Sequence, residues 1–205
     1  MGLLIKLFYI FVVLANSYLC LPTKLAKSES HLWNATGLNI ISRVEWLAKE
    51  STEASTTLGL PVPYVIIAHT ATQSCFSQIR CSAIVRNIQT YHVNSSDFID
   101  IGYNFLIGGA GDVYLGRGWE NEGAHTKGYN AISVGIAFIG DFQHCSPTDS
   151  QIAACKKLIK QGVEAGFIKK QYKLLGARQL RNTQSPGDKL FNEIKMWENW
   201  VEKPE

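Results

Sequence analysis

Hydrophobic residues follow two different periods along this chain, and the alternation between them outlines the fold. Residues 64–68 (YVIIA) form an unbroken apolar run after a loop rich in Ser, Thr, Gly and Pro, which predicts a strand buried on both faces. Residues 77–92 carry apolar side chains at helical spacing, which predicts an amphipathic helix. Residues 132–139 alternate with small residues and predict a second interior strand.

A glycine-rich segment between two apolar runs predicts a β-hairpin. Residues 103–107 are largely apolar and aromatic, residues 108–112 (GGAGD) tolerate positive φ, and residues 113–115 resume the strand pattern. Polar and aromatic side chains gather on both sides of this hairpin, which a purely structural hairpin does not require. We interpret them as a binding surface made of His92, Asp97, Phe98, Tyr103, Arg117, Trp119, His125 and Asn130.

The C-terminal third predicts two helices and one short strand. Thr148 and Gln151 form a capping-box pattern ahead of an apolar helical stripe, and Gly166 ends that helix. Residues 172–175 predict a strand, and Asp188 is expected to cap a last helix. The resulting order β-α-β-β-β-α-β-α predicts an α/β fold with a mixed central β-sheet and surrounding helices.

Composition favours one globular domain, which we place at residues 38–205. With 205 residues, of which 46% are hydrophobic and 18% charged, the chain can bury one core and has little room for a second. The net charge of +3 comes from 20 basic and 17 acidic residues that are scattered along the sequence. No basic run is dense enough to neutralise a phosphate backbone, so we expect no nucleic-acid partner.

The N-terminus predicts export from the cell. Residues 1–20 combine one lysine, an apolar run and small residues, as in a secretory signal peptide, with cleavage expected between residues 17 and 20. The run is shorter than the roughly 20 apolar residues of a membrane span, so we expect no membrane anchor. Residues 21–37 form an extended lead-in, and Asn34 and Asn94 lie in glycosylation sequons. We therefore expect a secreted, extracellular protein.

Five cysteines in an exported chain predict disulfides. Cys75 and Cys81 are close together at the start of the first predicted helix and are the first expected pair. Cys145 and Cys155 form a second expected pair, across the start of the next helix. Cys20 is either removed with the signal peptide or left as an odd thiol or rival partner, and the sequence leaves both possibilities open.

Several motifs in one order carry a family resemblance. They are YVIIAHTAT, YHVNSSDFIDIGYNFLIGGAGDVYLGRGW, GAHTKGYN, SVGIAFIGDF and NTQSPGDKLF. Over residues 38–200 the chain resembles the peptidoglycan recognition proteins, in particular their short secreted insect forms. The resemblance implies the fold of phage-type zinc N-acetylmuramoyl-L-alanine amidases, with a cleft that holds the peptidoglycan stem peptide.

The resemblance also locates the positions at which amidase members of the family bind zinc. Those positions are Ala68, Ala177 and Ser185 in this chain. A methyl group cannot ligate a metal, and a serine hydroxyl is a poor zinc ligand beside thiolate or imidazole. Tyr103 and Thr183 match positions that assist amidase catalysis, but without zinc they have no activated water to assist. We therefore expect no metal, no cofactor and no amidase activity.

The same resemblance implies a set of peptide-binding residues in the cleft. The set comprises His69, Thr70, His92, Asp97, Phe98, Tyr103, Arg117, His125, Asn130 and Thr183. For His69, His92 and His125, the alternatives are a replacement metal site or burial with backbone partners. The spacing of these three histidines gives no indication of a metal site.

Two features give opposite indications about the stem peptide. Arg117 matches the position of an arginine that takes the extra carboxylate of diaminopimelate stems. Asp97 and Phe98 instead match the pair found in lysine-type binders, and an aspartate repels an added carboxylate. We lean slightly towards lysine-type stems. In the alternative, Arg117 is solvated or paired with Glu120 or Glu122.

These observations predict a secreted, non-catalytic pattern-recognition receptor that binds bacterial peptidoglycan in an innate immune response and acts through a partner protein. A decoy that sequesters peptidoglycan fragments would need the same cleft. A residual hydrolase, either an amidase or a Ser185-dependent peptidase, is an alternative from another class. A third is an interaction protein whose cleft has been put to another use.

Overall fold

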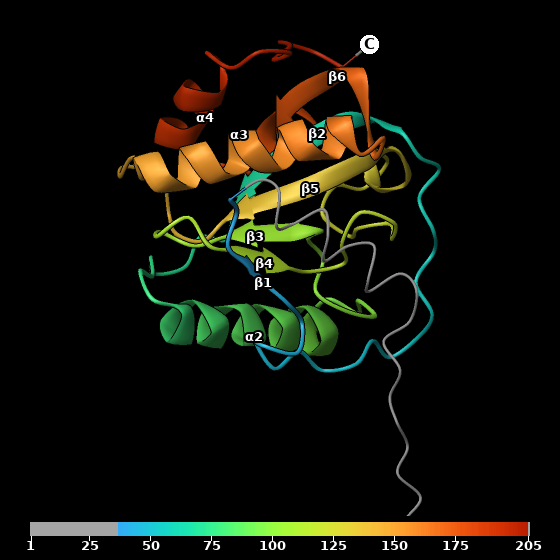
Figure 1. Cartoon of the computed structure of the whole chain (residues 1–205), viewed down its shortest axis with the longest axis vertical. Helices are drawn as coiled ribbons and strands as arrows, with labels where there is room; N and C mark the ends of the chain where they lie inside the picture. The colour runs from blue at the N-terminus through green and yellow to red at the C-terminus, as the bar shows by residue number, and fades with distance from the viewer. Residues whose placement is uncertain (1–36, 205) are drawn as a thin grey trace, which may run out of the picture.

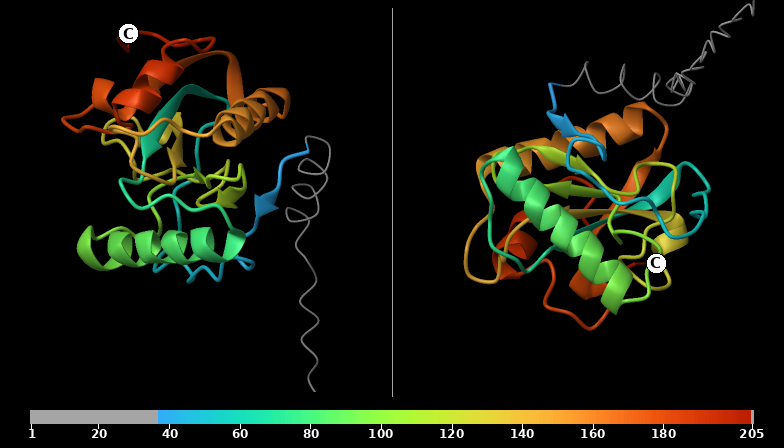
Figure 2. Two further views of the ribbon diagram at one scale, coloured as in Figure 1. Left: turned by 90° about the vertical axis from the view of Figure 1, so that its left-hand side faces the viewer. Right: turned by 90° about the horizontal axis from the view of Figure 1, so that it is seen from below.

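One mixed β-sheet between two helical layers organises the computed structural model, which describes residues 37–204 (Figures 1 and 2). Its strand order is β1-β4-β3-β5-β2-β6. The strands are β1 (Ile40–Ile41), β2 (Val62–His69), β3 (Phe105–Ile107), β4 (Val113–Leu115), β5 (Ser133–Phe138) and β6 (Ile168–Gly176). The helices are α2 (Gln78–Ser95), α3 (Asp149–Glu164) and α4 (Asp188–Ile194), with short 3-10 turns η1 (Asn130–Ile132) and η2 (Ala177–Gln179).

The apolar run of β2 places this strand inside the sheet, as predicted. It pairs in parallel with β5 on one side and with β6 on the other, and all six residues of β5 are buried. Its side chains alternate between two cores. Val65 and Ile67 face the core beneath α3 and α4, whereas Ile66 and Ala68 face the core beneath α2. The predicted mixed sheet with surrounding helices is therefore confirmed.

The predicted hairpin is also confirmed. β3 and β4 pair antiparallel, with Leu106 opposite Tyr114, and Gly111 in the connecting turn adopts a φ of +93°. The predicted capping box and glycine stop of α3 are present as well. The Thr148 hydroxyl accepts the backbone N–H of Gln151 at 3.1 Å, and Gly166, with φ +80°, follows the end of the helix. Local turn and cap chemistry thus fixed these boundaries correctly.

Three elements differ from the sequence prediction. β1 was missed because two residues beside a polar lead-in give no periodic signal; it pairs in parallel with β4. β6 begins at Ile168 rather than at residue 172, because its exposed residues 169–171 (KKQ) hide the strand pattern at the sheet edge. The last helix has Gly187, not Asp188, as its N-cap, and ends at Ile194.

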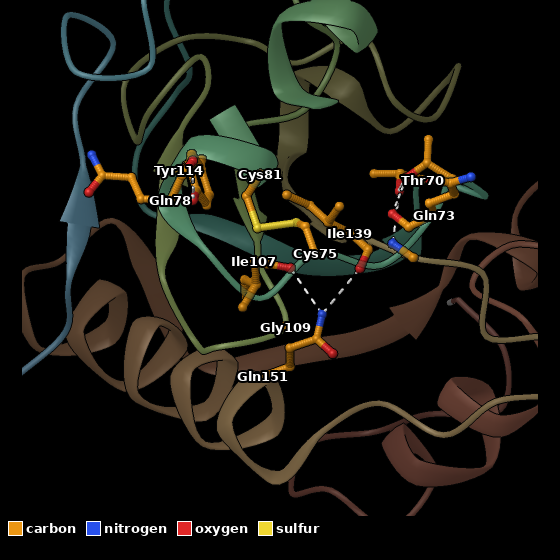
Figure 3. The surroundings of a disulfide bond; sticks show 12 residues. Thr70, Gln73, Cys75, Gln78, Cys81, Ile107, Gly109, Tyr114, Ile139 and Gln151 are labelled. Atoms are coloured by element: carbon orange, nitrogen blue, oxygen red, sulfur yellow. Dashed lines mark hydrogen bonds between the residues drawn. A yellow bond between two sulfur atoms is a disulfide. The ribbon is translucent and has the colours of Figure 1, made fainter. Parts of the chain in front are cut away.

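The cysteine predictions divide into one success and one error. Cys75 and Cys81 form a disulfide that joins the loop after β2 to the first turn of α2 (Figure 3). The expected Cys145–Cys155 pair is wrong, since both thiols are free. Cys155 packs in the core on the inner face of α3, whereas Cys145 is exposed ahead of that helix, so the two side chains point to different environments.

Some predictions fall outside the described part of the chain. These are the signal peptide, almost all of the lead-in, Asn34 and Cys20. Asn94 is exposed on the last turn of α2, and its glycosylation stays a prediction. Within residues 37–204, none of the helices is both long and apolar enough to cross a membrane.

Candidate functional site

A cavity of about 490 Å³ opens between the C-terminal half of α2 and the loop that follows β2. Its lining combines hydroxyl, amide, aromatic and aliphatic groups: Thr70, Thr72, Gln73, Ile84, Asn87, Ile88, Tyr91, His92 and Tyr103. Its volume lies within the range of small-ligand sites. The lining contains no aspartate, glutamate, lysine or arginine, so the cavity favours neutral, hydrogen-bonding ligands.

His92 stands at the centre of an aromatic group in this cavity. Its ring lies 5.3 Å from that of Phe98 and 5.6 Å from that of Tyr103. Its Nδ1 accepts the backbone N–H of Gly102 at 2.9 Å. Burial, reinforced by the positive charge of Arg117, lowers the pKa of His92 to about 4. The ring is therefore neutral at physiological pH, with its proton on Nε2 as a hydrogen-bond donor.

The opposite wall of the cavity is held by the loop after β2. The Thr70 hydroxyl accepts the backbone N–H of Gly140 at 3.0 Å and lies 2.7 Å from the hydroxyl of Thr72. Farther along the loop, the carbonyl of Cys75 accepts the N–H of Gly109 at 2.8 Å, next to the disulfide. The disulfide and the hairpin therefore hold the Cys75 end of this loop (Figure 3), and the bond from Gly140 holds its Thr70 end.

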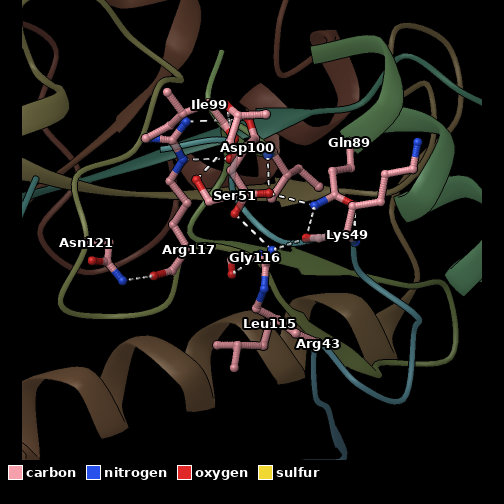
Figure 4. A network of polar contacts seen from close by, with 12 residues as sticks. Arg43, Lys49, Ser51, Gln89, Ile99, Asp100, Leu115, Gly116, Arg117 and Asn121 are labelled. Atoms are coloured by element: carbon pink, nitrogen blue, oxygen red, sulfur yellow. Dashed lines mark hydrogen bonds and ion pairs between the residues drawn. The ribbon is translucent and has the colours of Figure 1, made fainter. Parts of the chain in front are cut away.

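A buried carboxylate organises the base of α2 (Figure 4). Asp100 is 4% exposed; its Oδ1 accepts the amide N–H of Gln89 and the backbone N–H of Ile101, both at 2.7 Å. Its Oδ2 lies 2.9 Å from the guanidinium of Arg43. The Gln89 amide also bonds to both backbone groups of Lys49. These partners compensate the buried charge of Asp100, which would otherwise be costly. The network also ties α2 to two loops.

Arg117 makes its contacts with backbone carbonyls rather than with carboxylates. Its Nε donates to Ile101 at 2.7 Å and one terminal nitrogen donates to the carbonyl of Glu122 at 2.8 Å. The other terminal nitrogen has only a 3.4 Å contact, to the carbonyl of Asp100. Among the described residues, Arg117 forms no side-chain ion pair with Glu120 or Glu122, so the paired form of the alternative is not observed.

Asp97 and Phe98, which are adjacent in sequence, lie in different environments. Asp97 is exposed in a turn, with a left-handed φ of +55°. Phe98 packs on His92 behind the lining of the cavity. Trp119, which the sequence suggested as part of the binding surface, is instead a core residue that is 1% exposed and stacks on Phe167. An aromatic residue after a hairpin gives no sequence signal that separates these two roles.

Ala68, Ala177 and Ser185 lie together at the end of β2, and we call this region the alanine corner. Ala68 and Ala177 belong to the core beneath α2, and the Ser185 hydroxyl accepts the backbone N–H of His69 at 3.0 Å. Two methyl groups and a hydroxyl that already accepts a hydrogen bond do not form a zinc donor set. The residues present at these positions therefore do not fit the metal that the amidase fold implies.

The histidine beside this corner is not arranged as a base for Ser185. His69 is 8% exposed, and its Nδ1 accepts the backbone N–H of Phe142 at 3.2 Å. Burial lowers its pKa more than the carboxylate of Asp141, 3.7 Å away, raises it. In the neutral ring Nδ1 is therefore the acceptor and the proton is on Nε2. Nδ1 has no proton to donate to Asp141, and Nε2 has no free lone pair with which to act as a base. Thr183 accepts the N–H of Ser185 at 3.2 Å.

His125 is buried next to β5, and the half-buried Asn130 holds its backbone. Asn130 accepts the backbone N–H groups of His125 and Thr126 at 3.1 and 2.7 Å. The His125 ring lies against Gly135, where an added Cβ would be 2.4 Å from it. Burial, with the charges of Arg117 and Arg181, lowers the pKa of His125 to about 3. Its Nε2 has no hydrogen-bond partner within the described residues.

The structure thus brings three of the predicted binding residues, Thr70, His92 and Tyr103, into the lining of one cavity. The remaining seven are not among its lining residues, and their binding role stays a prediction. Sequence reasoning missed the contribution of α2, which adds Ile84, Asn87, Ile88 and Tyr91. Their helical spacing along one face could have indicated this wall, because residues three and four apart share a side of a helix.

Known proteins share both sequence and fold with this chain. The profile of the N-acetylmuramoyl-L-alanine amidase family matches residues 58–188. Peptidoglycan-recognition protein 2 of Holotrichia diomphalia is 47% identical over 165 residues, which cover 80% of this chain and 88% of the relative. Peptidoglycan-recognition protein SA of Drosophila melanogaster is 49% identical over 144 residues, which cover 70% and 71%.

A solved structure extends the likeness to three dimensions. Peptidoglycan recognition protein LE, in complex with tracheal cytotoxin, a monomeric diaminopimelic acid-type peptidoglycan, superimposes with a TM-score of 0.79 at 43% identity. The match covers 80% of this chain and 96% of that protein.

Proposed function

The chain belongs to the peptidoglycan recognition protein family, and we propose that it is a secreted receptor that binds bacterial peptidoglycan without cleaving it. The cavity beside α2 carries this proposal. Its neutral lining of hydroxyls, amides and aromatic rings suits the amide and hydroxyl groups of a glycan with its stem peptide. Protein LE, whose fold is shared, is bound to tracheal cytotoxin, a monomeric peptidoglycan.

The alanine corner supports the non-catalytic part of the proposal. Family enzymes require zinc to lower the pKa of a bound water and so generate the nucleophile. Ala68 and Ala177 have no donor atom, and Ser185 is 7% exposed with its oxygen bonded to the backbone. The same geometry gives the peptidase alternative no support, because the nearest histidine presents Nδ1 to a backbone N–H.

The hydrogen bonds of Arg117 indicate which part of its guanidinium would contact the stem peptide. One terminal nitrogen makes only the long contact to Asp100, so this corner of the guanidinium can take a ligand carboxylate while its two short bonds persist. Asp97 is exposed, and its carboxylate favours the ammonium group of a lysine-type stem instead. We propose that lysine-type stems bind slightly better and that diaminopimelate stems depend more strongly on Arg117.

Titration calorimetry with lysine-type and diaminopimelate-type muropeptides tests this proposal. We expect Tyr91→Ala and Tyr103→Ala to weaken both by about tenfold, since each removes an aromatic wall of the cavity. Met196→Ala, which removes an exposed apolar side chain outside the cavity lining, is the matched control. Failure of the wild-type chain to bind either muropeptide would overturn the proposal.

A second measurement tests the absence of cleavage. The wild-type chain, incubated with muropeptides and zinc, should release no free stem peptide by mass spectrometry. Ala68→His, Ala177→His and Ser185→Cys combined restore a set of zinc ligands, and this variant should bind about one zinc per chain. Release of peptide by the wild-type chain that stops on addition of a chelator, or in Ser185→Ala, would establish a hydrolase instead.

Signalling through a partner protein and secretion complete the proposal. They rest on the predicted signal peptide and on family membership. Expression in insect cells, with the mature N-terminus determined from the culture medium, tests secretion directly.

A further inference from the structure

The turn after β1 displays large apolar side chains although it is firmly anchored. We define the acidic turn as residues 42–53. Within it, Val44 is 82% exposed and Leu47 67% exposed, and Leu47 has a left-handed φ of +60°. Between them, Trp46 is fully buried, and its indole N–H donates to the carbonyl of Leu115 at 2.9 Å. The buried indole holds the turn in place while its neighbours point to solvent.

Arg43 adds a second anchor to the acidic turn (Figure 4). It pairs with Asp100 at 2.9 Å and donates to the carbonyls of Gly116 and Lys49 at 3.0 and 2.9 Å. A turn fixed in this way loses little conformational freedom when it binds another surface. Its exposed charged side chains are three glutamates and one lysine: Glu45, Lys49, Glu50 and Glu53. The turn is thus a preorganised acidic and apolar surface.

A groove of complementary character lies between α3, β6 and the segment after α4. It has a volume of about 450 Å³, and we call it the α3–β6 groove. Apolar groups come from Ile159, Val163, Tyr172 and Trp197, and Met196 beside them is 75% exposed. Lys156, Lys160 and Lys170, all exposed, supply ammonium groups. The groove therefore offers apolar contact with a positively charged edge.

Charge differs between the two parts of the described chain that carry these surfaces. Residues 149–204 contain eleven lysines and arginines against six acidic residues, a net charge of +5. Residues 37–148 contain six against nine, a net charge of −3. The acidic turn passes beneath α2, whereas α3 and α4 lie on the other side of the sheet, of which β6 is an edge strand (Figures 1 and 2). The two surfaces therefore cannot meet within one molecule.

We propose that the acidic turn of one copy docks into the α3–β6 groove of a second copy. Val44 and Leu47 would cover the apolar floor of the groove, while Glu50 and Glu53 would face Lys160 and Lys170. Because the two patches differ and lie on opposite sides, the contact is heterologous and joins copies head to tail. It leaves the cavity beside α2 outside the contact, so it stands independently of peptidoglycan binding.

The carboxylates in the groove do not cancel this complementarity. Glu164 already has Lys160 as a partner at 3.7 Å, and Lys156 lies 3.8 Å from Glu193 and 4.8 Å from the Trp197 ring. Exposed pairs of this kind are weak and can exchange for contacts across an interface. Three lysines against two glutamates, Glu164 and Glu198, leave the lining positive.

Sedimentation equilibrium of the full mature chain at low salt tests this association. We expect concentration-dependent self-association that weakens by about tenfold at physiological salt, because the ion pairs at the rim are screened. Lys160→Glu with Lys170→Glu should be monomeric, and so should Glu50→Lys with Glu53→Lys. A mixture of these two double variants should associate, since each lost charge pair is then restored in reverse.

Two further variants separate the contact from general charge effects. Val44→Ser with Leu47→Asn removes the apolar contacts but keeps the charges, and it should abolish association while thermal melting is maintained. Arg80→Glu with Lys127→Glu changes the net charge as the groove variant does, at exposed positions outside the groove, and should still associate. A wild-type chain that stays monomeric at low salt, or a mixture of the charge variants that stays monomeric, would overturn the proposal.

Discussion

The cavity beside α2 and the alanine corner adjoin the same end of β2, yet different forces hold them. The corner consists of methyl groups and a backbone-bonded hydroxyl, and it is packed into a core. The cavity is open and depends on a disulfide, a buried carboxylate and neutral histidine. Apolar packing does not depend on pH or redox state, whereas the disulfide, the carboxylate and the neutral histidine can each be lost by reduction, by mutation or by protonation. The cavity should therefore be the sensitive region of this pair.

Of the changes that distinguish the cavity from the alanine corner, acidification should reduce the stability of the fold most. The pKa values of His92 and His125 are lowered from 6.5 to about 4 and about 3 in the folded chain. As the pH falls below 6.5, the unfolded chain binds protons that the folded chain cannot, so stability is lost progressively down to those values. Urea denaturation across this range checks the loss.

Imidazole NMR shifts provide the local reading of the same experiment. His92, in the cavity, should titrate before His125, and His92→Gln should reduce the dependence of stability on pH. Ordinary titration of both rings near pH 6.5 would contradict the buried, neutral state.

Removal of the buried carboxylate should be the next largest effect. Asp100→Ala leaves Arg43 without its ion pair and leaves donors of Gln89 and Ile101 unsatisfied, at a cost of about 3 kcal/mol in unfolding free energy. Muropeptide binding should weaken as α2 loosens. Asp97→Asn, at an exposed position, is the control and should change stability by less than about 0.5 kcal/mol. Equal effects at both positions would contradict the role of the network.

Loss of the disulfide should have a smaller effect on the same wall. Cys75→Ser with Cys81→Ser frees the loop that carries Thr70, and closure of so short a loop is worth about 2 kcal/mol. Calorimetric melting and muropeptide titration should both register the change. Cys145→Ser, at an exposed free thiol, should leave both unaltered. Unchanged binding in the double variant would show that the loop is held by its hydrogen bonds alone.

Arg117→Ala should give the smallest effect and the most informative one. Loss of its carbonyl bonds to Ile101 and Glu122 should weaken binding of both stem types, and loss of the free guanidinium corner should weaken diaminopimelate binding several-fold more. Paired titrations measure the difference. Equal losses for the two ligands would mean that Arg117 only positions the backbone.

Strong local patterns predicted most of the fold. The apolar run of β2, the glycine turn of the hairpin and the cap of α3 each encode their element in a few adjacent residues. β1 was missed because its two residues are a strand only by virtue of their partner β4. The exposed lysines of β6 concealed the start of an edge strand, where charged residues are ordinary.

The site was predictable in its chemistry but not in its arrangement. Family motifs pointed to His92 and Tyr103, which do line the cavity, and to His69 and His125, which are buried beside the backbone. Nothing in the spacing of these residues distinguishes the two outcomes, because burial depends on contacts between distant segments. The free state of Cys155 has the same origin, since its neighbours in space come from other elements.

The two ladders that flank β2 also constrain how this molecule could be redesigned. Ala68 lies opposite Ala137 in the parallel pairing with β5, while Ile67 lies opposite Gly176 in the pairing with β6. A slip of one residue would turn every side chain of the strand to the opposite face. Chemistry could therefore be returned to the corner by exchanging side chains on an unchanged backbone, whereas an insertion or deletion in this strand would destroy the corner and the adjacent binding wall together.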